Sequence, residues 1–273
     1  MKRFVALAAD LGAADGARLV LRELGIRTYQ SMAYPTLERK FEVQFDPVWR
    51  WISRDIRERD VLRFARDRIR PGNTVFDVGA HVGEWALLFS ELVGPSGRVV
   101  AFEPDPVACA SLKKNLERNS ITNVSVEERS VSDKVGKALL ATERFGSGLS
   151  SIVRPYVHGT DRRELEVEST TLDEYCEERG LRPDWIKVDA EGAEPLIVQG
   201  MQRTIERLHP SVILEFHSDA LTDEERTEAW RAITRRASSV AVLESTPKNH
   251  EYLEELPKGF VPDRRFLMVY VKY

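Results

Sequence analysis

The chain has 273 residues, of which 42% are hydrophobic and 31% charged, and its formal net charge is −4. These values are typical of a soluble globular protein, and a pI near 5.9 excludes the basic footprint expected of a nucleic-acid-binding domain. The two cysteines, Cys109 and Cys176, have neither metal-ligand spacing nor the density of a disulfide framework. No stretch approaches the ~20 apolar residues of a membrane span, so we expect a cytoplasmic protein.

The N-terminal part of the chain, residues 1–70, predicts a mostly helical extension that packs on the main domain or forms a lid over it. Apolar residues recur at helical spacing over residues 1–30. Short strands or loops are expected over 28–51, and a second helix over 53–68. We therefore place the main domain at residues 71–273.

Strands and helices alternate from residue 73 onward. The expected strands are 74–79, 98–103, 123–128, 184–189, 211–216, 239–244 and 265–272. The expected helices are 83–93, 105–119, 171–179, 193–207 and 222–236. This alternation predicts an α/β fold with a mostly parallel, seven-stranded sheet of the Rossmann-like type and helices on both faces. The last two strands are joined without a helix, which favours an antiparallel last strand. The stretch 134–169 interrupts the alternation, with a glycine and hydroxyl cluster followed by a strand-like segment, 164–170.

The first two expected strands end in residues suited to a cofactor. Residues 75–83 read V-F-D-V-G-A-H-V-G, and Glu103 ends the next strand. A glycine-containing turn with an acid roughly 20 residues later holds an adenosine-containing cofactor in such sheets, and the carboxylate fits a ribose diol. The spacing of Gly79 and Gly83 is not the G-x-G-x-x-G of dinucleotide sites, and Asp77 would repel a pyrophosphate. The positive charges of S-adenosylmethionine fit this polarity, whereas NAD does not.

Neighbouring residues in these two loops complete the expected cofactor site. They are Ala80, His81 and Trp85 after the first strand, and Pro104 and Asp105 after the second. Some members of the site also have a structural interpretation. Glu103 could be a helix cap or a surface acid, and His81 could contribute only its backbone amide. Asp77 lies inside a strand, where an unpaired carboxylate is costly, so loop amides or the cofactor's ammonium group would have to partner it.

Four polar side chains follow the fourth and fifth expected strands, at the edge where ligands bind in open α/β sheets. Asp189 ends an apolar strand and is the predicted reaction centre, and Glu191 follows it closely. Glu215 and His217 alternate around Phe216, so both should point to the same side of the sheet. The alternatives are that Asp189 caps the next helix and that His217 is a structural residue.

Six motifs share their order and spacing with a known family. They are D-V-G-A-H-V-G-E-W, F-E-P-D-P, S-S after a glycine-rich loop, T-L-D-E-Y, W-I-K-V-D-A-E-G-A-E and V-I-L-E-F-H. Over residues 70–220 the chain resembles the FkbM-type S-adenosylmethionine-dependent methyltransferases. This resemblance implies a class I methyltransferase fold and, usually, O-methylation of hydroxyls on sugars or on polyketide-type secondary metabolites. The first 70 residues match no family signature.

The resemblance also assigns residues to roles. Asp77, Gly79, Gly83 and Glu103 correspond to the cofactor site. Arg129 and Ser130 would lie near the adenine. Asp189 and Glu191 would lie beside the transferred methyl group, where Asp189 also counts as a cofactor contact. The expected substrate contacts are Glu191, Ser150 and Ser151.

Two mechanisms remain open for the proton of the acceptor hydroxyl. In the first, His217 or Asp189 accepts the proton while Glu215 orients the imidazole. In the second, Asp189, Glu215 and His217 hold a divalent cation, Mg²⁺ or Mn²⁺, that acidifies the hydroxyl. We favour the metal-free mechanism because the sequence has no tight ligand spacing.

Other classes of protein fit the sequence less well. A nucleic-acid amine methylase would have an Asn/Asp-Pro-Pro-aromatic segment where this chain has Asp189-Ala190-Glu191-Gly192. A nicotinamide oxidoreductase conflicts with the glycine spacing, and a non-catalytic cofactor-binding protein of the same fold is a third alternative. The expected acceptor is a small molecule or glycan. Trp49 and Trp51 could stack on a sugar face or pack in the interior.

Overall fold

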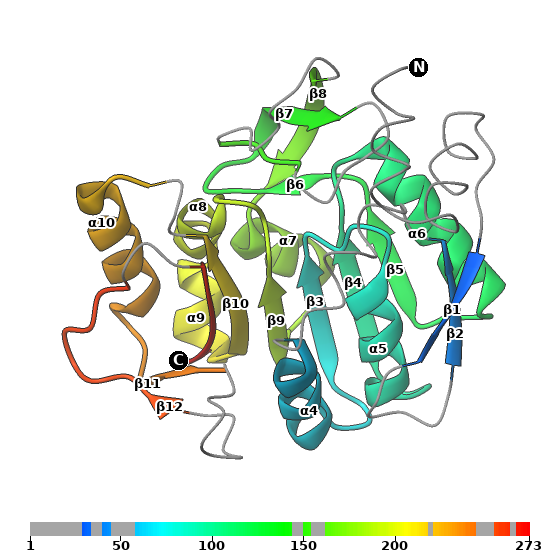
Figure 1. The fold of residues 1–273 in the computed structure, drawn as a ribbon, viewed down its shortest axis with the longest axis horizontal. Helices are drawn as coiled ribbons and strands as arrows, with labels where there is room; N and C mark the ends of the chain where they lie inside the picture. Colours follow the sequence, from blue (N-terminus) through cyan, green and yellow to red (C-terminus); the bar gives the residue numbers. More distant parts are fainter. Residues whose placement is uncertain are drawn as a thin grey trace, which may run out of the picture.

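The computed structural model describes residues 29–33, 40–44, 58–143, 150–153, 162–217, 221–243, 254–262 and 266–273. A central sheet with helices on both of its faces forms the body of this part of the chain (Figure 1). Its strands are β3 (Thr74–Val78), β4 (Arg98–Phe102), β5 (Val124–Glu127), β9 (Trp185–Val188), β10 (Ser211–His217), β11 (Ser239–Val242), β12 (Glu254–Glu255) and β13 (Phe266–Lys272). The helices are α4 (Glu58–Arg68), α5 (Glu84–Val93), α6 (Pro106–Arg118), α7 (Leu172–Arg179), α8 (Glu194–Gln199), α9 (Gln202–Leu208) and α10 (Asp223–Thr234).

The strand order of the central sheet is β12-β11-β13-β10-β9-β3-β4-β5. The five neighbours from β10 to β5 pair in parallel. Strand β13 lies between β10 and β11 and is antiparallel to both. The predicted seven-stranded, mostly parallel sheet with an antiparallel last strand is therefore confirmed, and β12 adds a two-residue strand at one edge.

Successive residues of the strands point to opposite faces of the sheet, and both faces are apolar because both are covered. Val75, Val99 and Ile213 pack with α4, α5 and α6. Phe76, Val100 and Leu214 pack with α7, α8, α9 and α10. Near-continuous apolar strands of this kind are typical of a parallel sheet that is buried on both sides.

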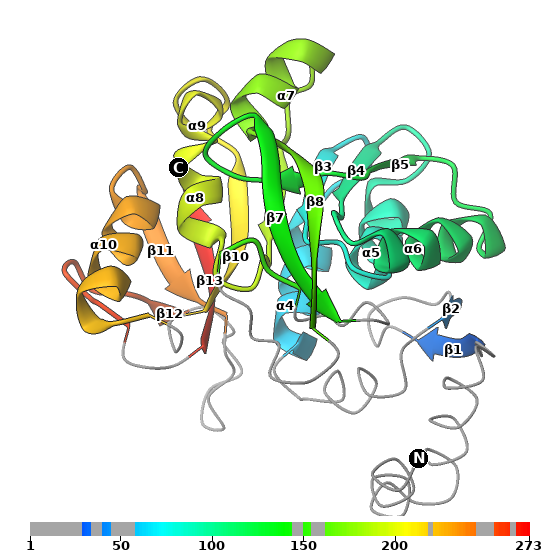
Figure 2. The ribbon, with the colours of Figure 1, turned by 90° about the horizontal axis from the view of Figure 1, so that it is seen from above.

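A second, three-stranded sheet covers the carboxyl ends of the central strands (Figures 1 and 2). We call it the roof sheet. Its members are β6 (Ser130–Val131), β8 (Arg162–Thr170) and β7 (Gly136–Glu143), in that spatial order. The alternating pattern of 164–170 predicted β8. Strand β7 was not predicted, because G-K-A-L-L-A-T-E contains several weak strand formers.

The predicted helix 193–207 is wrong in one respect, because the structure divides it into α8 and α9. The chain bends at Gly200, where an added Cβ atom would lie 2.0 Å from the carbonyl oxygen of Ser132. The close approach of two backbones therefore requires glycine at the position that directly follows α8. Helical periodicity alone does not contain this information.

The N-terminal region is described only in part. Strands β1 (Tyr29–Ala33) and β2 (Lys40–Gln44) form an antiparallel pair, and α4 contributes to the core, where Phe64 contacts Trp185 and Tyr270. The predicted helical periodicity over 1–28, Trp49, Trp51 and the glycine cluster at 144–149 lie outside the described residues. The assignment of 1–70 as a separate lid stays a prediction. Among the described helices, none has the length and hydropathy required to cross a membrane.

Candidate functional site

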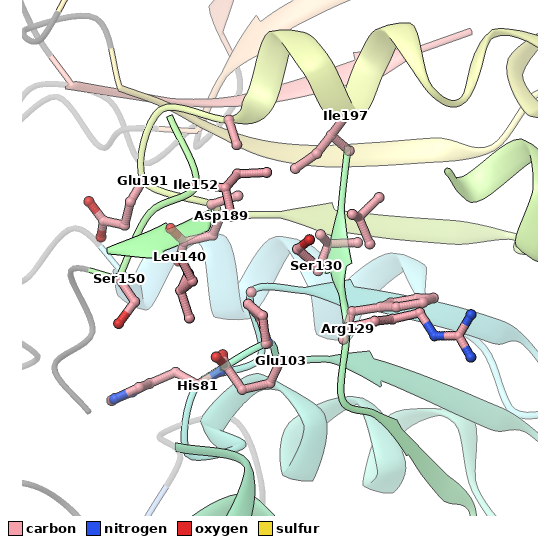
Figure 3. A pocket seen from close by; sticks show the side chains of 17 residues that line it. His81, Glu103, Arg129, Ser130, Leu140, Ser150, Ile152, Asp189, Glu191 and Ile197 are labelled. Atoms are coloured by element: carbon pink, nitrogen blue, oxygen red, sulfur yellow. The ribbon is translucent and has the colours of Figure 1, made fainter. Parts of the chain in front are cut away.

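A cleft lies where β3, β4 and β9 end, beneath the roof sheet (Figure 3). It encloses about 660 Å³, part of which is open to solvent. The predicted site residues that line it are Gly79, His81, Glu103, Pro104, Arg129, Ser130, Ser150, Asp189 and Glu191. The apolar side chains that also line it include Leu140 from β7, Ile197 from α8, and Ile152. The lining does not include Asp77, Ala80, Gly83, Trp85, Asp105, Ser151, Glu215 or His217.

Both glycines of the first loop are required by close packing. Gly79 has φ +80°, and a Cβ atom there would lie 1.7 Å from the carbonyl oxygen of Asp189. Gly83 has φ +94°, and its Cβ would lie 2.3 Å from a methyl carbon of Leu112 on α6. Glycine adopts such left-handed conformations without steric cost. Gly79 therefore lets the loop after β3 approach Asp189 at the end of β9, and Gly83 lets α5 approach α6.

Glu103 is buried at the end of β4, with both carboxylate oxygens held by the backbone. Oε2 accepts a hydrogen bond from the amide of His81 at 2.7 Å, and Oε1 accepts one from the amide of Asp105 at 2.8 Å. Burial raises the pKa of Glu103 to about 8, although these two amide donors lower it. Its carboxyl group is thus fixed in orientation and turned toward the side of the cleft occupied by His81 (Figure 3).

Asp105 stabilises the structure around the cleft, because both of its carboxylate oxygens accept hydrogen bonds. One of its oxygens caps α6 by accepting the amides of Val107 and Ala108. The other accepts the hydroxyl groups of Thr142, on β7, and Ser150. Asp105 therefore joins the loop that follows β4 to the roof sheet. Its predicted contact with a cofactor stays a prediction.

Lys187 is an important residue that the sequence analysis missed. It lies directly opposite Asp77 in the pairing of β9 with β3, and both side chains are buried. Its Nζ atom is 3.8 Å from Asp77 and 3.2 Å from Asp189, and 5.6 Å from the ring centre of Trp85. Lysine in the middle of the apolar strand W-I-K-V was the available signal, because a buried lysine requires acidic partners.

The charges of Asp77 and Lys187 depend on each other. Burial raises the pKa of Asp77 to about 6, against the lowering effect of Lys187. Burial lowers the pKa of Lys187, but Asp189, Asp77 and Glu215 together raise it above its ordinary value. Neither carboxylate oxygen of Asp77 accepts a hydrogen bond from the described residues. The ammonium group of Lys187 is therefore the cation that faces Asp77 among the described residues. The predicted contact of Asp77 with a cofactor stays a prediction.

Asp189, Glu215 and His217 converge at the edge of the cleft, as predicted from their positions on β9 and β10. One potential ligand atom from each lies within 4.8 Å of the others. Nε2 of His217 is 3.5 Å from Glu191 and 3.6 Å from Glu215. Among the described residues, however, the carboxylate nearest to the imidazole is that of Glu194, whose Oε1 is 3.0 Å from Nδ1. Glu194, and not Glu215 alone, therefore orients the ring.

The electrostatic environment distinguishes the members of this cluster. Burial lowers the pKa of His217, but Glu194 and Glu191 raise it well above its ordinary value. Burial raises the pKa of Asp189, but Lys187 and His217 bring it below its ordinary value. Burial and the neighbouring Asp189 raise the pKa of Glu215 well above normal. These shifts favour the cationic form of the imidazole, the ionised form of Asp189 and the protonated form of Glu215.

The sheet order, the antiparallel β13 and the cleft at the ends of β3, β4 and β9 define the class I methyltransferase fold. A crystal structure of methyltransferase FkbM from Methylobacillus flagellatus has the same fold, with a TM-score of 0.50 and 18% identity over 78% of this chain and 47% of that chain. The family model described as methyltransferase FkbM domain matches residues 77–249, more than half of the chain. The chain therefore belongs to the methyltransferase FkbM domain family.

Curated relatives differ in what their names say they methylate. The 31-O-demethyl-FK506 methyltransferase FkbM of Streptomyces tacrolimicus is 29% identical over 162 residues, which cover 49% of this chain and 61% of the relative. A ribosomal protein L11 methyltransferase of Pelotomaculum thermopropionicum is 35% identical over 100 residues, covering 36% of this chain and 32% of the relative. The matches span less than two thirds of the length of these relatives.

Proposed function

We propose that the chain transfers a methyl group from S-adenosylmethionine to a hydroxyl of a sugar, glycan or secondary metabolite. The observation that carries this proposal is the acidic character of the cleft, with Glu103 on one side and Asp189 and Glu191 on another. The carboxyl group of Glu103 fits a ribose diol, and the ionised Asp189 fits a cationic sulfonium and would repel a pyrophosphate. The O-methyl acceptor in the name of the FkbM relative supports the choice of oxygen as the methyl acceptor.

The residues present fit this cofactor. Glu103 would accept the ribose hydroxyls, the loop at Gly79 leaves no side chain in the way, and Arg129 and Ser130 would border the adenine. When bound, S-adenosylmethionine supplies an electrophilic methyl group. The protein's remaining task is to align the acceptor and take its proton.

We infer that Asp189 takes this proton. It lines the cleft and is held ionised, whereas His217 does not line the cleft and is held protonated. Two cations already face the surrounding acids. Lys187 lies beside Asp77 and Asp189, and His217 lies beside Glu191 and Glu194. We therefore favour the mechanism without a divalent cation.

Cofactor binding provides the first test. We expect S-adenosylmethionine and S-adenosylhomocysteine, but not NAD, to raise the thermal denaturation midpoint. Glu103→Gln should weaken S-adenosylhomocysteine binding about 10- to 100-fold in calorimetry. The NH2 group of glutamine cannot accept the backbone amide that one carboxyl oxygen accepts, and leaving a buried donor without an acceptor costs roughly 1–3 kcal/mol. Glu128→Gln is the matched control, because Glu128 is exposed and pairs with Lys113 at the surface. Stabilisation by NAD alone would contradict the proposal.

Proton removal provides the second test, with release of S-adenosylhomocysteine measured over a panel of hydroxylated glycosides and macrolides. Asp189→Asn should slow turnover by about 100-fold or more, the range for losing a general base. Extensive chelation of the wild-type enzyme should leave turnover unchanged. Turnover lost on chelation and restored by Mg²⁺ or Mn²⁺ would replace this mechanism with the metal-assisted one.

A further inference from the structure

We propose that Glu194 is a positioning residue that fixes the His217 imidazole and the loop carrying Asp189 and Glu191, and thereby prepares this edge of the cleft for methyl transfer. This inference rests on the proposed function, because it concerns the groups that surround the reacting hydroxyl. It assigns a role to a residue that does not line the cleft.

Glu194 begins α8 and is completely buried. Its Oε1 atom is 3.0 Å from Nδ1 of His217, and it accepts the backbone amides of Ala190 and Gly192 at 3.1 Å each. One carboxylate oxygen thus receives two loop amides and the Nδ1–H of the ring. Hydrogen bonds to a carboxylate are stronger than neutral ones, so this oxygen joins β10 to the loop that follows β9.

The loop needs such an anchor because its backbone is unusual. Glu191 has φ +49°, in the left-handed region that is costly for a residue with a side chain. Its two neighbours donate their amides to Glu194, and its own carbonyl oxygen accepts the hydroxyl of Ser151 at 2.7 Å. The contacts from Glu194 and Ser151 hold Glu191 in this conformation, facing the cleft.

The position of Nδ1 determines what the other ring nitrogen faces. With Nδ1 directed at Glu194 of α8, Nε2 faces Glu191 of the loop and Glu215 of its own strand. Asp189, at the end of β9, also acts on the ring, and the ring in turn helps to lower the pKa of Asp189. Lys187 is the other cation that acts on this group of acids. The negative charge of Glu194 therefore affects the pKa of Asp189 indirectly, because it stabilises the protonated His217 ring.

Glu194→Gln separates the two roles of this carboxylate, because glutamine keeps an oxygen for the loop amides but removes the charge beside the ring. Nitrogen-15 NMR of the histidine rings in the full chain, with His217 assigned through His217→Gln, reports which ring nitrogens carry protons. We expect a hydrogen-bonded Nδ1–H in the wild type and a proton affinity at least about ten-fold lower in Glu194→Gln. The exposed Glu178→Gln is the matched control and should leave the ring unchanged.

Kinetics then test the consequence for methyl transfer, using an acceptor that the wild type methylates. Glu194→Gln should lower kcat about ten-fold or more with little change in KM for S-adenosylmethionine, and Glu194→Gln/His217→Gln should be no slower than His217→Gln alone. An unchanged His217 ring in a folded Glu194→Gln variant, or additive losses in the double variant, would overturn the proposal. If the wild type binds neither S-adenosylmethionine nor S-adenosylhomocysteine, the proposed function fails, and the NMR result still decides whether Glu194 fixes the ring.

Discussion

Replacing Gly79 by alanine is expected to abolish cofactor binding and to lower the free energy of unfolding by about 2–5 kcal/mol, the sum of two costs. The first cost is the left-handed backbone at φ +80°, worth roughly 1–2 kcal/mol for a residue with a Cβ atom. The second is the overlap with the carbonyl oxygen of Asp189, only 1.7 Å from the new carbon. That overlap can be relieved only by moving one of the two loops that meet at the cleft.

Gly180 provides the matched control for this prediction. It ends α7 with φ +62°, and nothing lies within 4 Å of the Cβ atom that alanine would add there. Gly180→Ala should therefore show only the backbone cost, about 1–2 kcal/mol, with normal binding of S-adenosylhomocysteine. Urea denaturation and calorimetry measure both quantities. Equal effects at the two glycines would mean that the contact with Asp189 is unimportant.

Lys187→Met is expected to lower the free energy of unfolding by about 3–5 kcal/mol at neutral pH, the usual cost of removing one partner from a buried ion pair. Asp77 would remain in the interior without its cation. Its pKa is already raised from 3.8 to about 6, so ionisation of Asp77 weakens the fold as the pH rises through that range. Without the lowering effect of Lys187 the folded-state pKa rises further. The difference between variant and wild type should therefore grow from about pH 5 to about pH 8.

Two further variants show whether the buried charge is the cause. Adding Asp77→Asn to Lys187→Met removes the stranded carboxylate and should restore part of the lost stability, most clearly at the higher pH. Lys113→Met removes an exposed lysine that pairs with Glu128 at the surface and should cost less than about 0.5 kcal/mol. A Lys187→Met variant as stable as Lys113→Met, or destabilised equally at all pH values, would contradict this account.

The sequence was sufficient for the fold because the central strands are bounded by turns and covered on both faces. Their apolar runs, such as V-V-A-F at the end of β4, differ clearly from the amphipathic helices between them. The strand-end positions of Glu103, Asp189, Glu215 and His217 were likewise readable, because parallel strands bring their carboxyl ends to one edge. Strand β7 was missed because its residues are weak strand formers. The partners of Lys187 and Glu194 were missed because they depend on which segments approach each other in space, although a lysine within an apolar strand was a visible signal.

The order of segments along the chain also separates two kinds of evolutionary change. Apart from Arg129 and Ser130, the groups proposed to hold the methyl donor come from β3, β4, β9 and their loops, whereas much of the opposite wall comes from the excursion between β5 and α7. Hydrogen bonds that join the described part of that excursion to the framework include those of Thr142 and Ser150 to Asp105 and of Ser151 to the carbonyl oxygen of Glu191. A lineage could therefore exchange or lengthen the excursion, and with it the range of molecules admitted, while the donor-binding framework remains under its own separate selection.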